Sequence, residues 1–237
     1  MSQEKKSQDE KLERQALEEY DEEIFDHLLE IEAKSLPLPY YMRFHTKLDW
    51  SDRRELVENF FSYSEEFSIP VEVVFLALNF VDRFLSSNSA SSSFKLLGAV
   101  AFVLAVKYET PDVHYIYPKT ETETDPSILE TMGGKDKGYT LSDIQSIERQ
   151  LLRALDYSLG TPSPFFFLRR IRTLDKSRQN ILGLAQYLAA STMLNEAFVG
   201  TRPSLIAAAS YFLSLTLLNH NNAGQYKSTL KWVSKVP

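Results

Sequence analysis

The stretch from Leu96 to Val106 contains no charged or polar side chain. In a globular protein, such a composition is typical of a helix that other helices cover on all sides. Small residues such as Gly98 and Ala101 allow neighbouring helices to approach closely. Lys107, which follows directly, can lay its aliphatic stem on the core and keep its ammonium group in water. We therefore expect a helix over about residues 92–108 at the centre of a helical bundle.

A second charge-poor segment, rich in alanine, spans about residues 203–218 and begins at Pro203. It lies about 110 residues after the first segment, and this spacing indicates a repeated unit. The glycine and prolines of residues 160–164 predict a boundary between two bundles. Only about 20 residues follow the second segment, so we expect the second bundle to be shortened or incomplete at its C-terminal end.

Apolar side chains at helical spacing predict the remaining helices. One follows Trp50 and is expected to be capped by Ser51 or Asp52. The others are placed at about 70–86, 141–155 and 178–194, whereas residues 110–139, which contain several prolines and a Gly-Gly pair, predict a long loop. The fold class is therefore expected to be all-α.

Acidic charge is concentrated at the start of the chain. The formal net charge is −6, and residues 1–35, with 12 acidic and five basic side chains, carry −7. Apolar residues from Leu12 to Ile31 recur every three or four positions and predict an amphipathic helix, which Pro37 and Pro39 end. This helix either packs on its own domain or also offers a face to a partner. The rest of the chain is nearly neutral and has no basic stripe, which argues against binding to nucleic acid.

Several kinds of site and of location are disfavoured by what the sequence lacks. The chain has no cysteine, which excludes disulfides, thiolate zinc sites and cysteine nucleophiles. Its four histidines lie far apart, and no phosphate-binding loop or nucleophile motif is present. No apolar run approaches the roughly 20 residues of a membrane helix, and the charged first residues do not form a signal peptide. We therefore expect no metal site, cofactor site, catalytic site or membrane segment. An enzyme whose site is built from scattered carboxylates is the interpretation that the sequence supports least.

Several blocks of sequence, in order, resemble the cyclin family. The blocks are Arg53–Val57 (RRELV), Asn79–Ser86 (NFVDRFLS), Leu96–Gly98 (LLG), Leu104–Glu109 (LAVKYE), Ile147–Leu152 (IERQLL), Thr161–Pro164 (TPSP) and Pro203–Ala209 (PSLIAAA). The leader Glu19–Ile24 (EYDEEI) is most similar to the entry segment of B-type cyclins, which act in mitosis and S phase. The similarity runs from about residue 18 to 218.

The resemblance implies a cyclin fold, in which an N-terminal helix precedes two helical bundles. On this basis residues 1–17 form a flexible acidic leader, and residues 18–47 form the N-terminal helix and a linker. Residues 48–159 form the first cyclin box. Residues 160–237 form a second box that is incomplete at its C-terminus.

The function that the resemblance implies is that of a regulatory subunit, not an enzyme, that binds and activates a cyclin-dependent kinase in the cell cycle. Lys107 and Glu148 match a pair that holds the backbone at one end of the kinase's regulatory helix. The other residues that match family contacts to the kinase are Leu104, Tyr108, Leu152, Tyr157, Leu159 and Ile24. The alternative for Lys107 and Glu148 is an ion pair that links two helices within the bundle. Kinase substrates or inhibitors are further expected partners, and the expected location is nucleus and cytoplasm.

Two further features depend on the same resemblance. Asp82 and Arg83 are expected to form a buried ion pair that fixes helix packing. The family's substrate-docking patch maps onto Arg53, Leu56, Asn59 and Lys95, but the match is poor. Asp52 and Asn59 replace its methionine and tryptophan, and Lys95 would repel a substrate arginine.

A different class of protein shares this expected fold. General transcription factors of the TFIIB type use a cyclin-like fold to bind DNA and polymerase. The nearly neutral body of the chain and the B-type leader favour the kinase regulator over this alternative.

Overall fold

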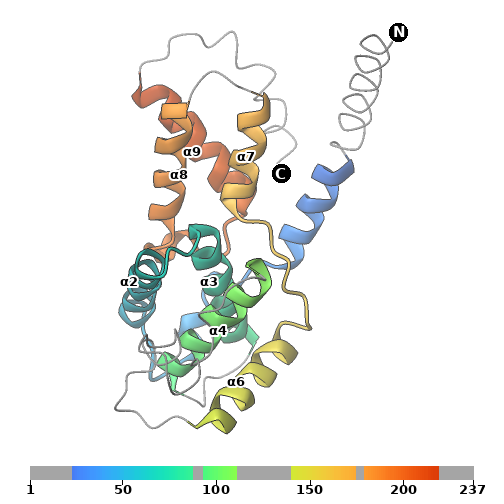
Figure 1. Ribbon diagram of the computed structural model, residues 1–237, viewed down its shortest axis with the longest axis vertical. Helices are drawn as coiled ribbons and strands as arrows, with labels where there is room; N and C mark the ends of the chain where they lie inside the picture. The colour runs from blue at the N-terminus through green and yellow to red at the C-terminus, as the bar shows by residue number, and fades with distance from the viewer. Residues whose placement is uncertain (1–22, 88–92, 111–139, 175–178, 219–237) are drawn as a thin grey trace, which may run out of the picture.

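The protein is a stack of two helical bundles with one additional helix beside them (Figure 1). The structure, a computed structural model, describes residues 23–87, 93–110, 140–174 and 179–218. The first bundle contains α2 (Trp50–Glu66), α3 (Val71–Ser87), α4 (Phe94–Glu109) and α6 (Leu141–Ala154). The second contains α7 (Pro164–Leu174), α8 (Gln179–Thr192) and α9 (Pro203–Leu217), and two short 3-10 turns are η1 (Tyr41–Phe44) and η2 (Glu196–Phe198). The predicted all-α fold is confirmed, whereas the leader at 1–17 and most of the predicted loop at 110–139 lie outside the described residues.

Helix α4 is the centre of the first bundle, as its composition predicted. Every side chain from Leu96 to Val106 is buried, and Phe102 packs against Phe60 of α2 with ring centroids 5.1 Å apart. Gly98 faces the Leu56 side chain so closely that a β-carbon at residue 98 would collide with it. The absence of a side chain at Gly98 is what allows α2 and α4 to approach.

The first turn of α2 is capped by a residue that the sequence patterns did not single out. Asp49, in extended conformation, accepts hydrogen bonds from the backbone N–H groups of Ser51 and Asp52, and the Asp52 side chain accepts one from the Asp49 N–H. The prediction of Ser51 or Asp52 as the cap was therefore wrong by two or three residues. Asp52 is instead the reciprocal member of a capping box, and Thr140 and Asp143 form the same arrangement at the start of α6.

Helix α9 differs from α4 in its surroundings. One side, including Ile206, Ala207 and Tyr211, is buried against α7 and α8. The opposite side carries exposed Phe212 and Leu217. Within the described residues, α9 is therefore covered on one side only.

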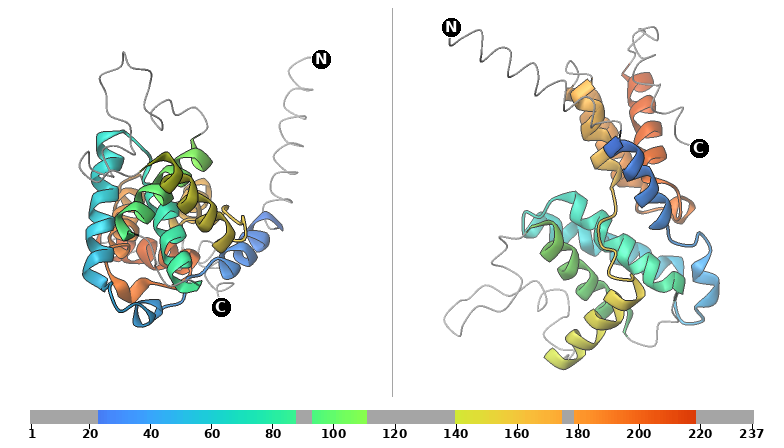
Figure 2. Two further views of the ribbon diagram at one scale, coloured as in Figure 1. Left: turned by 90° about the horizontal axis from the view of Figure 1, so that it is seen from below. Right: turned by 90° about the vertical axis from the view of Figure 1, so that its right-hand side faces the viewer.

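The N-terminal helix (residues 23–34) lies against the second bundle, although it precedes the first bundle in sequence (Figure 2). Phe25 packs edge-on against Phe167 of α7 with ring centroids 6.0 Å apart. At the other end of this helix, the Asn79 side chain of α3 donates a hydrogen bond of 3.0 Å to the Ser35 carbonyl oxygen. The N-terminal helix thus contacts both bundles. The part of the predicted amphipathic helix before residue 23 is not among the described residues.

Candidate functional site

Lys107 and Glu148, which the family resemblance pairs, do meet in the structure. Lys107 is in the last turn of α4 and Glu148 is in the middle of α6, and Lys107 Nζ lies 2.8 Å from Glu148 Oε1. Their side chains are 29% and 27% exposed, so both groups are still accessible from outside. The contact links two helices of one bundle and at the same time leaves polar atoms at the surface. Its role in binding a partner therefore stays a prediction.

Exposed aromatic side chains flank the Lys107–Glu148 pair in the chain. Tyr108 is 49% exposed and Tyr157 is 67% exposed, so both rings are accessible from outside. Tyr108 Oη lies close to Gly160, where a β-carbon would be 2.7 Å from it. Asp156 and Tyr157 both adopt left-handed backbone conformations, with φ of 51° and 55°, directly after α6. Two consecutive non-glycine residues in this region are uncommon, and such conformations cluster at functional sites.

The remaining predicted contact residues differ in how much surface they offer. Leu152 and Leu159 are half-buried and pack against the edge of the core. Leu104 is buried within α4, so it offers almost no surface for a partner. Ile24 is 52% exposed and lies on the N-terminal helix. Both views of Figure 2 place this helix beside the linker that joins α6 to α7.

We refer to the accessible members of this set, Ile24, Lys107, Tyr108, Glu148, Leu152, Tyr157 and Leu159, as the candidate contact surface. Its residues come from the N-terminal helix, the end of α4, the body of α6 and the linker after α6. Because these elements have different neighbours, the shape of the surface depends on the packing of the whole molecule.

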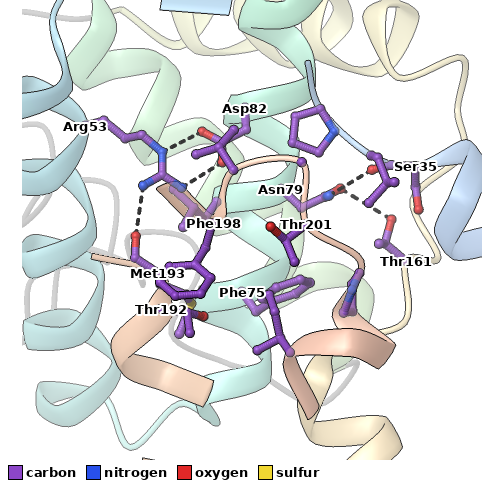
Figure 3. A pocket seen from close by; sticks show the side chains of 17 residues that line it. Ser35, Arg53, Phe75, Asn79, Asp82, Thr161, Thr192, Met193, Phe198 and Thr201 are labelled. Atoms are coloured by element: carbon purple, nitrogen blue, oxygen red, sulfur yellow. Dashed lines mark hydrogen bonds and ion pairs between the residues drawn. The ribbon is translucent and has the colours of Figure 1, made fainter. Parts of the chain in front are cut away.

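The predicted ion pair between Asp82 and Arg83 is wrong. Asp82 instead pairs with Arg53 of α2, whose Nε and Nη2 donate to Oδ1 and Oδ2 at 2.9 and 2.8 Å (Figure 3). Adjacent residues on a helix point about 100° apart and do not face each other. Arg83 therefore points elsewhere, and its guanidinium donates to the carbonyl oxygens of Ser158 and Leu155 at 2.9 and 3.3 Å.

The Arg53–Asp82 pair is the centre of a buried polar network. Tyr41 Oη donates to Asp82 Oδ1 at 2.7 Å, and Arg53 Nη1 donates to the Met193 carbonyl oxygen at 2.8 Å. Burial and then the Asp82 charge raise the pKa of Tyr41 far above its usual value. Burial by itself lowers the pKa of Arg53, but the Asp82 carboxylate outweighs it and the net shift is upward. The Arg53 guanidinium thus stays charged at every physiological pH.

The predicted substrate-docking residues do not form one accessible patch. Arg53 is only 4% exposed and is engaged with Asp82, so its prediction as a docking residue is wrong. Leu56 is buried beneath Gly98, and Asn59 is half-buried. Lys95 is exposed, but its ammonium group lies 3.1 Å from Glu55 of α2. A substrate arginine that approaches Lys95 meets its positive ammonium group, and the carboxylate of Glu55 is already paired with that group.

Two buried polar residues, Glu32 and Asn79, were not identified from the sequence. Glu32 accepts hydrogen bonds from Ser204 of α9. Asn79 bonds the Ser35 carbonyl oxygen, and Thr161 Oγ1 donates to Asn79 Oδ1 at 3.3 Å. Asn79 borders a cavity of about 50 Å³ between the bundles (Figure 3). Glu32 belongs to an acidic run whose other members within the described helix, Glu23, Asp26 and Glu30, are exposed, so no local signal distinguished it.

In the part of the chain that the structure describes, no three or more His, Asp or Glu side chains gather in a way that could hold a metal ion. No helix among these residues is long and apolar enough to cross a membrane. The side chains of the candidate contact surface offer hydrogen bonding, charge and apolar contact.

Comparison with known protein families identifies both bundles. Residues 23–160 match the family described as Cyclin, N-terminal domain, and residues 162–236 match Cyclin, C-terminal domain. The first match includes the N-terminal helix together with the first bundle. The boundary between the two matches falls in the linker after α6.

Individual relatives agree with the family matches. The chain is 36% identical over 203 residues to the G2/mitotic-specific cyclin cig1 of Schizosaccharomyces pombe, which covers 85% of this chain and 46% of that protein. It is 32% identical to the G2/mitotic-specific cyclin-3 of Saccharomyces cerevisiae, over 86% of this chain and 45% of that protein. The chain thus spans less than half the length of these curated relatives.

A solved structure has the same fold. A viral cyclin from herpesvirus saimiri superposes with a TM-score of 0.69 over 89% of each chain, at 16% sequence identity. At this identity the likeness concerns the fold, and it extends over both bundles.

Proposed function

Because this chain belongs to the cyclin family, we propose that it is a regulatory subunit that binds and activates a cyclin-dependent kinase in the cell cycle. The names of its relatives, G2/mitotic-specific cyclins, favour a role in mitosis. The chain has no catalytic role of its own in this proposal. It acts in the nucleus and the cytoplasm, where kinase substrates or inhibitors are further partners.

The observation that carries this proposal is the accessible Lys107–Glu148 pair, with the exposed rings of Tyr108 and Tyr157 on the elements beside it. An ammonium group and a carboxylate held 2.8 Å apart offer one donor and one acceptor in a fixed arrangement. A helix leaves backbone N–H groups unpaired at its N-terminus and carbonyl groups unpaired at its C-terminus. The carboxylate can accept from the former, and the ammonium group can donate to the latter. The rings supply apolar area with few rotatable bonds, which is typical of strong contact residues.

The physical mechanism is a population shift. A protein kinase is active only when its strand lysine is paired with a glutamate on the regulatory helix. A rigid surface that binds only the inward position of that helix increases the population of this position. The bundle is suited to this task because residues 96–106 of α4 are buried, and Lys107 directly follows this buried segment.

The test measures binding and activation with a purified, monomeric cyclin-dependent kinase subunit and the full 237-residue chain. Lys107→Ala and Glu148→Ala should each weaken binding about 30-fold, the size of a hot-spot loss. The exchanged pair Lys107→Glu with Glu148→Lys restores the internal ion pair but presents donor and acceptor in the wrong order. We therefore expect it to be folded, not to bind and not to activate.

The matched control is the exchange Glu55→Lys with Lys95→Glu. This pair also joins α4 to a neighbouring helix, but it lies near the other end of α4 and is more exposed. It should leave kinase binding unchanged. Undiminished kinase binding by the Lys107/Glu148 exchange would contradict the assignment of this pair. A different outcome would favour the TFIIB-type alternative: a wild-type chain that binds no kinase but binds duplex DNA with a steep salt dependence.

A further inference from the structure

A buried carboxylate attaches the N-terminal helix to the second bundle. Glu32 is fully buried, and its Oε1 and Oε2 accept hydrogen bonds from Ser204 Oγ at 2.6 Å and from the Ser204 N–H at 2.8 Å. Ser204 is in the first turn of α9, where backbone N–H groups have no partner within the helix. The positive end of the α9 dipole favours a carboxylate at this place. A buried carboxylate held by these two hydrogen bonds cannot shift without losing them.

A second attachment lies two turns earlier on the same helix. Phe25 is buried against Phe167 of α7, and the Arg170 guanidinium carbon lies 4.5 Å from the centroid of the Phe25 ring. A cation over an aromatic face at this distance is attractive. Phe25 and Glu32 are seven residues apart and therefore lie on one face of the helix. That face is turned toward α7 and α9.

The C-terminal end of the N-terminal helix is held by the first bundle instead. Asn79 Nδ2 donates to the Ser35 carbonyl oxygen, and the Leu38 N–H donates to Ser86 Oγ at 2.9 Å. Asn79 and Ser86 both belong to α3. The N-terminal helix is thus fixed along its length by the second bundle and at its end by the first.

Ile24 directly precedes Phe25 but remains exposed. We propose that Glu32 is a positioning residue for Ile24, so that the second bundle, through the Glu32–Ser204 contact, sets the affinity of the candidate contact surface for its kinase. This inference rests on the proposed function. If the Glu32 contact is lost, one of the two attachments to the second bundle is gone and the helix rests on that bundle through Phe25. Ile24 is then held less rigidly, and binding must restrict the added motion at a cost in affinity.

The experiment measures kinase affinity by calorimetry, with the full chain and a purified monomeric cyclin-dependent kinase subunit. Ile24→Ala and Glu32→Ala should each weaken binding about tenfold. The double variant should bind about as weakly as Ile24→Ala alone, because Glu32 acts through Ile24. Glu32→Gln should bind nearly as wild type, because its amide accepts from the Ser204 N–H and donates to Ser204 Oγ.

Glu30→Ala is the matched control, because Glu30 is on the same helix and is exposed. It should leave affinity unchanged. A folded Glu32→Ala variant with wild-type affinity would overturn the proposal. So would a loss of kinase affinity on Glu32→Ala that is equally large in the wild-type and in the Ile24→Ala background. If Glu32→Ala does not fold, Ser204→Ala removes only one of the two donors and should show the same coupling to Ile24 at a smaller loss.

A measurement without kinase separates this inference from the proposed function. In hydrogen exchange of the free chain, Glu32→Ala should speed exchange of the amides in residues 23–34 and leave those of α7 protected. Unchanged exchange in residues 23–34 would overturn the anchoring role, whatever the kinase result. If the wild-type chain binds no kinase while this exchange effect is seen, the proposed function fails and the anchoring itself stands.

Discussion

Arg53 and Asp82 form a bidentate ion pair that is almost completely buried, with Arg53 Nε and Nη2 donating to the two carboxylate oxygens at 2.9 and 2.8 Å. The third nitrogen of Arg53, Nη1, donates to the carbonyl oxygen of Met193, just beyond the end of α8. One side chain of α2 therefore connects α3 of its own bundle with the second bundle. The Arg53 guanidinium is thus hydrogen-bonded to both bundles at once.

We expect Asp82→Ala to be strongly destabilising. It leaves the Arg53 guanidinium buried without its counter-ion, and breaking a buried pair in this way costs about 3–5 kcal/mol. Urea unfolding monitored by circular dichroism measures the loss. Glu58→Ala, which breaks the exposed Arg54–Glu58 pair on α2, is the control and should change stability by less than about 0.5 kcal/mol. A loss below about 1 kcal/mol for Asp82→Ala would show that the network is not needed.

Alanine at two glycines should have opposite effects. Gly183 lies inside α8, and a β-carbon there meets no atom within 4 Å. Gly183→Ala should therefore raise the free energy of unfolding by about 0.5–1 kcal/mol, because alanine loses less backbone entropy in a helix. Gly98→Ala should lower it, because the new β-carbon collides with Leu56. Thermal unfolding of both variants checks the pair of predictions, and a stabilised Gly98→Ala would contradict the close packing of α2 and α4.

Gly160→Ala should alter the candidate contact surface with little effect on stability. The β-carbon would lie 2.7 Å from Tyr108 Oη, which is the free end of an exposed side chain and can move aside. We expect kinase affinity to fall while the melting temperature stays within about 2 °C of wild type. In a Tyr108→Phe background the hydroxyl is absent, so the same Gly160→Ala change should have no further effect on affinity. A loss of equal size in both backgrounds would mean that Tyr108 is not the residue affected.

The stability of the protein should depend on pH through Glu32. Burial raises the pKa of Glu32 above its usual value of 4.5, although the hydrogen bonds from Ser204 and the charge of Arg202 partly oppose this. The folded chain therefore binds this proton more tightly than the unfolded chain does. The resulting stabilisation is present below about pH 4.5 and is lost as the pH rises through the folded pKa.

Calorimetric melting of wild type and Glu32→Gln at pH 4.5 and pH 7.5 checks this direction. The melting temperature of wild type minus that of Glu32→Gln should be larger at pH 4.5 than at pH 7.5, because the glutamine does not titrate. A relative melting temperature that rises with pH would reverse the assigned sign.

Much of the fold was predictable because it depends on local patterns. The buried helix α4 followed from the composition of residues 96–106, and its predicted and observed ends agree within two residues. The start of α2 was misplaced, because Ser51, Asp52 and Asp49 are all good caps and only the backbone conformation decides between them. The side chains of the candidate contact surface came from the resemblance, and the structure brings Lys107 and Glu148 together as it implied.

The sequence by itself determined the helical class, the fully buried helix of the first bundle and membership of the family, because composition and ordered motifs are properties of short segments. Only the tertiary structure decided which groups meet. Asp82 pairs with Arg53 at a separation of 29 residues, Arg53 reaches Met193 across 140, and Glu32 reaches Ser204 across 172. No periodicity links residues so far apart. Their contacts arise because the bundles bury their apolar faces together, and each polar group left inside must then find a partner.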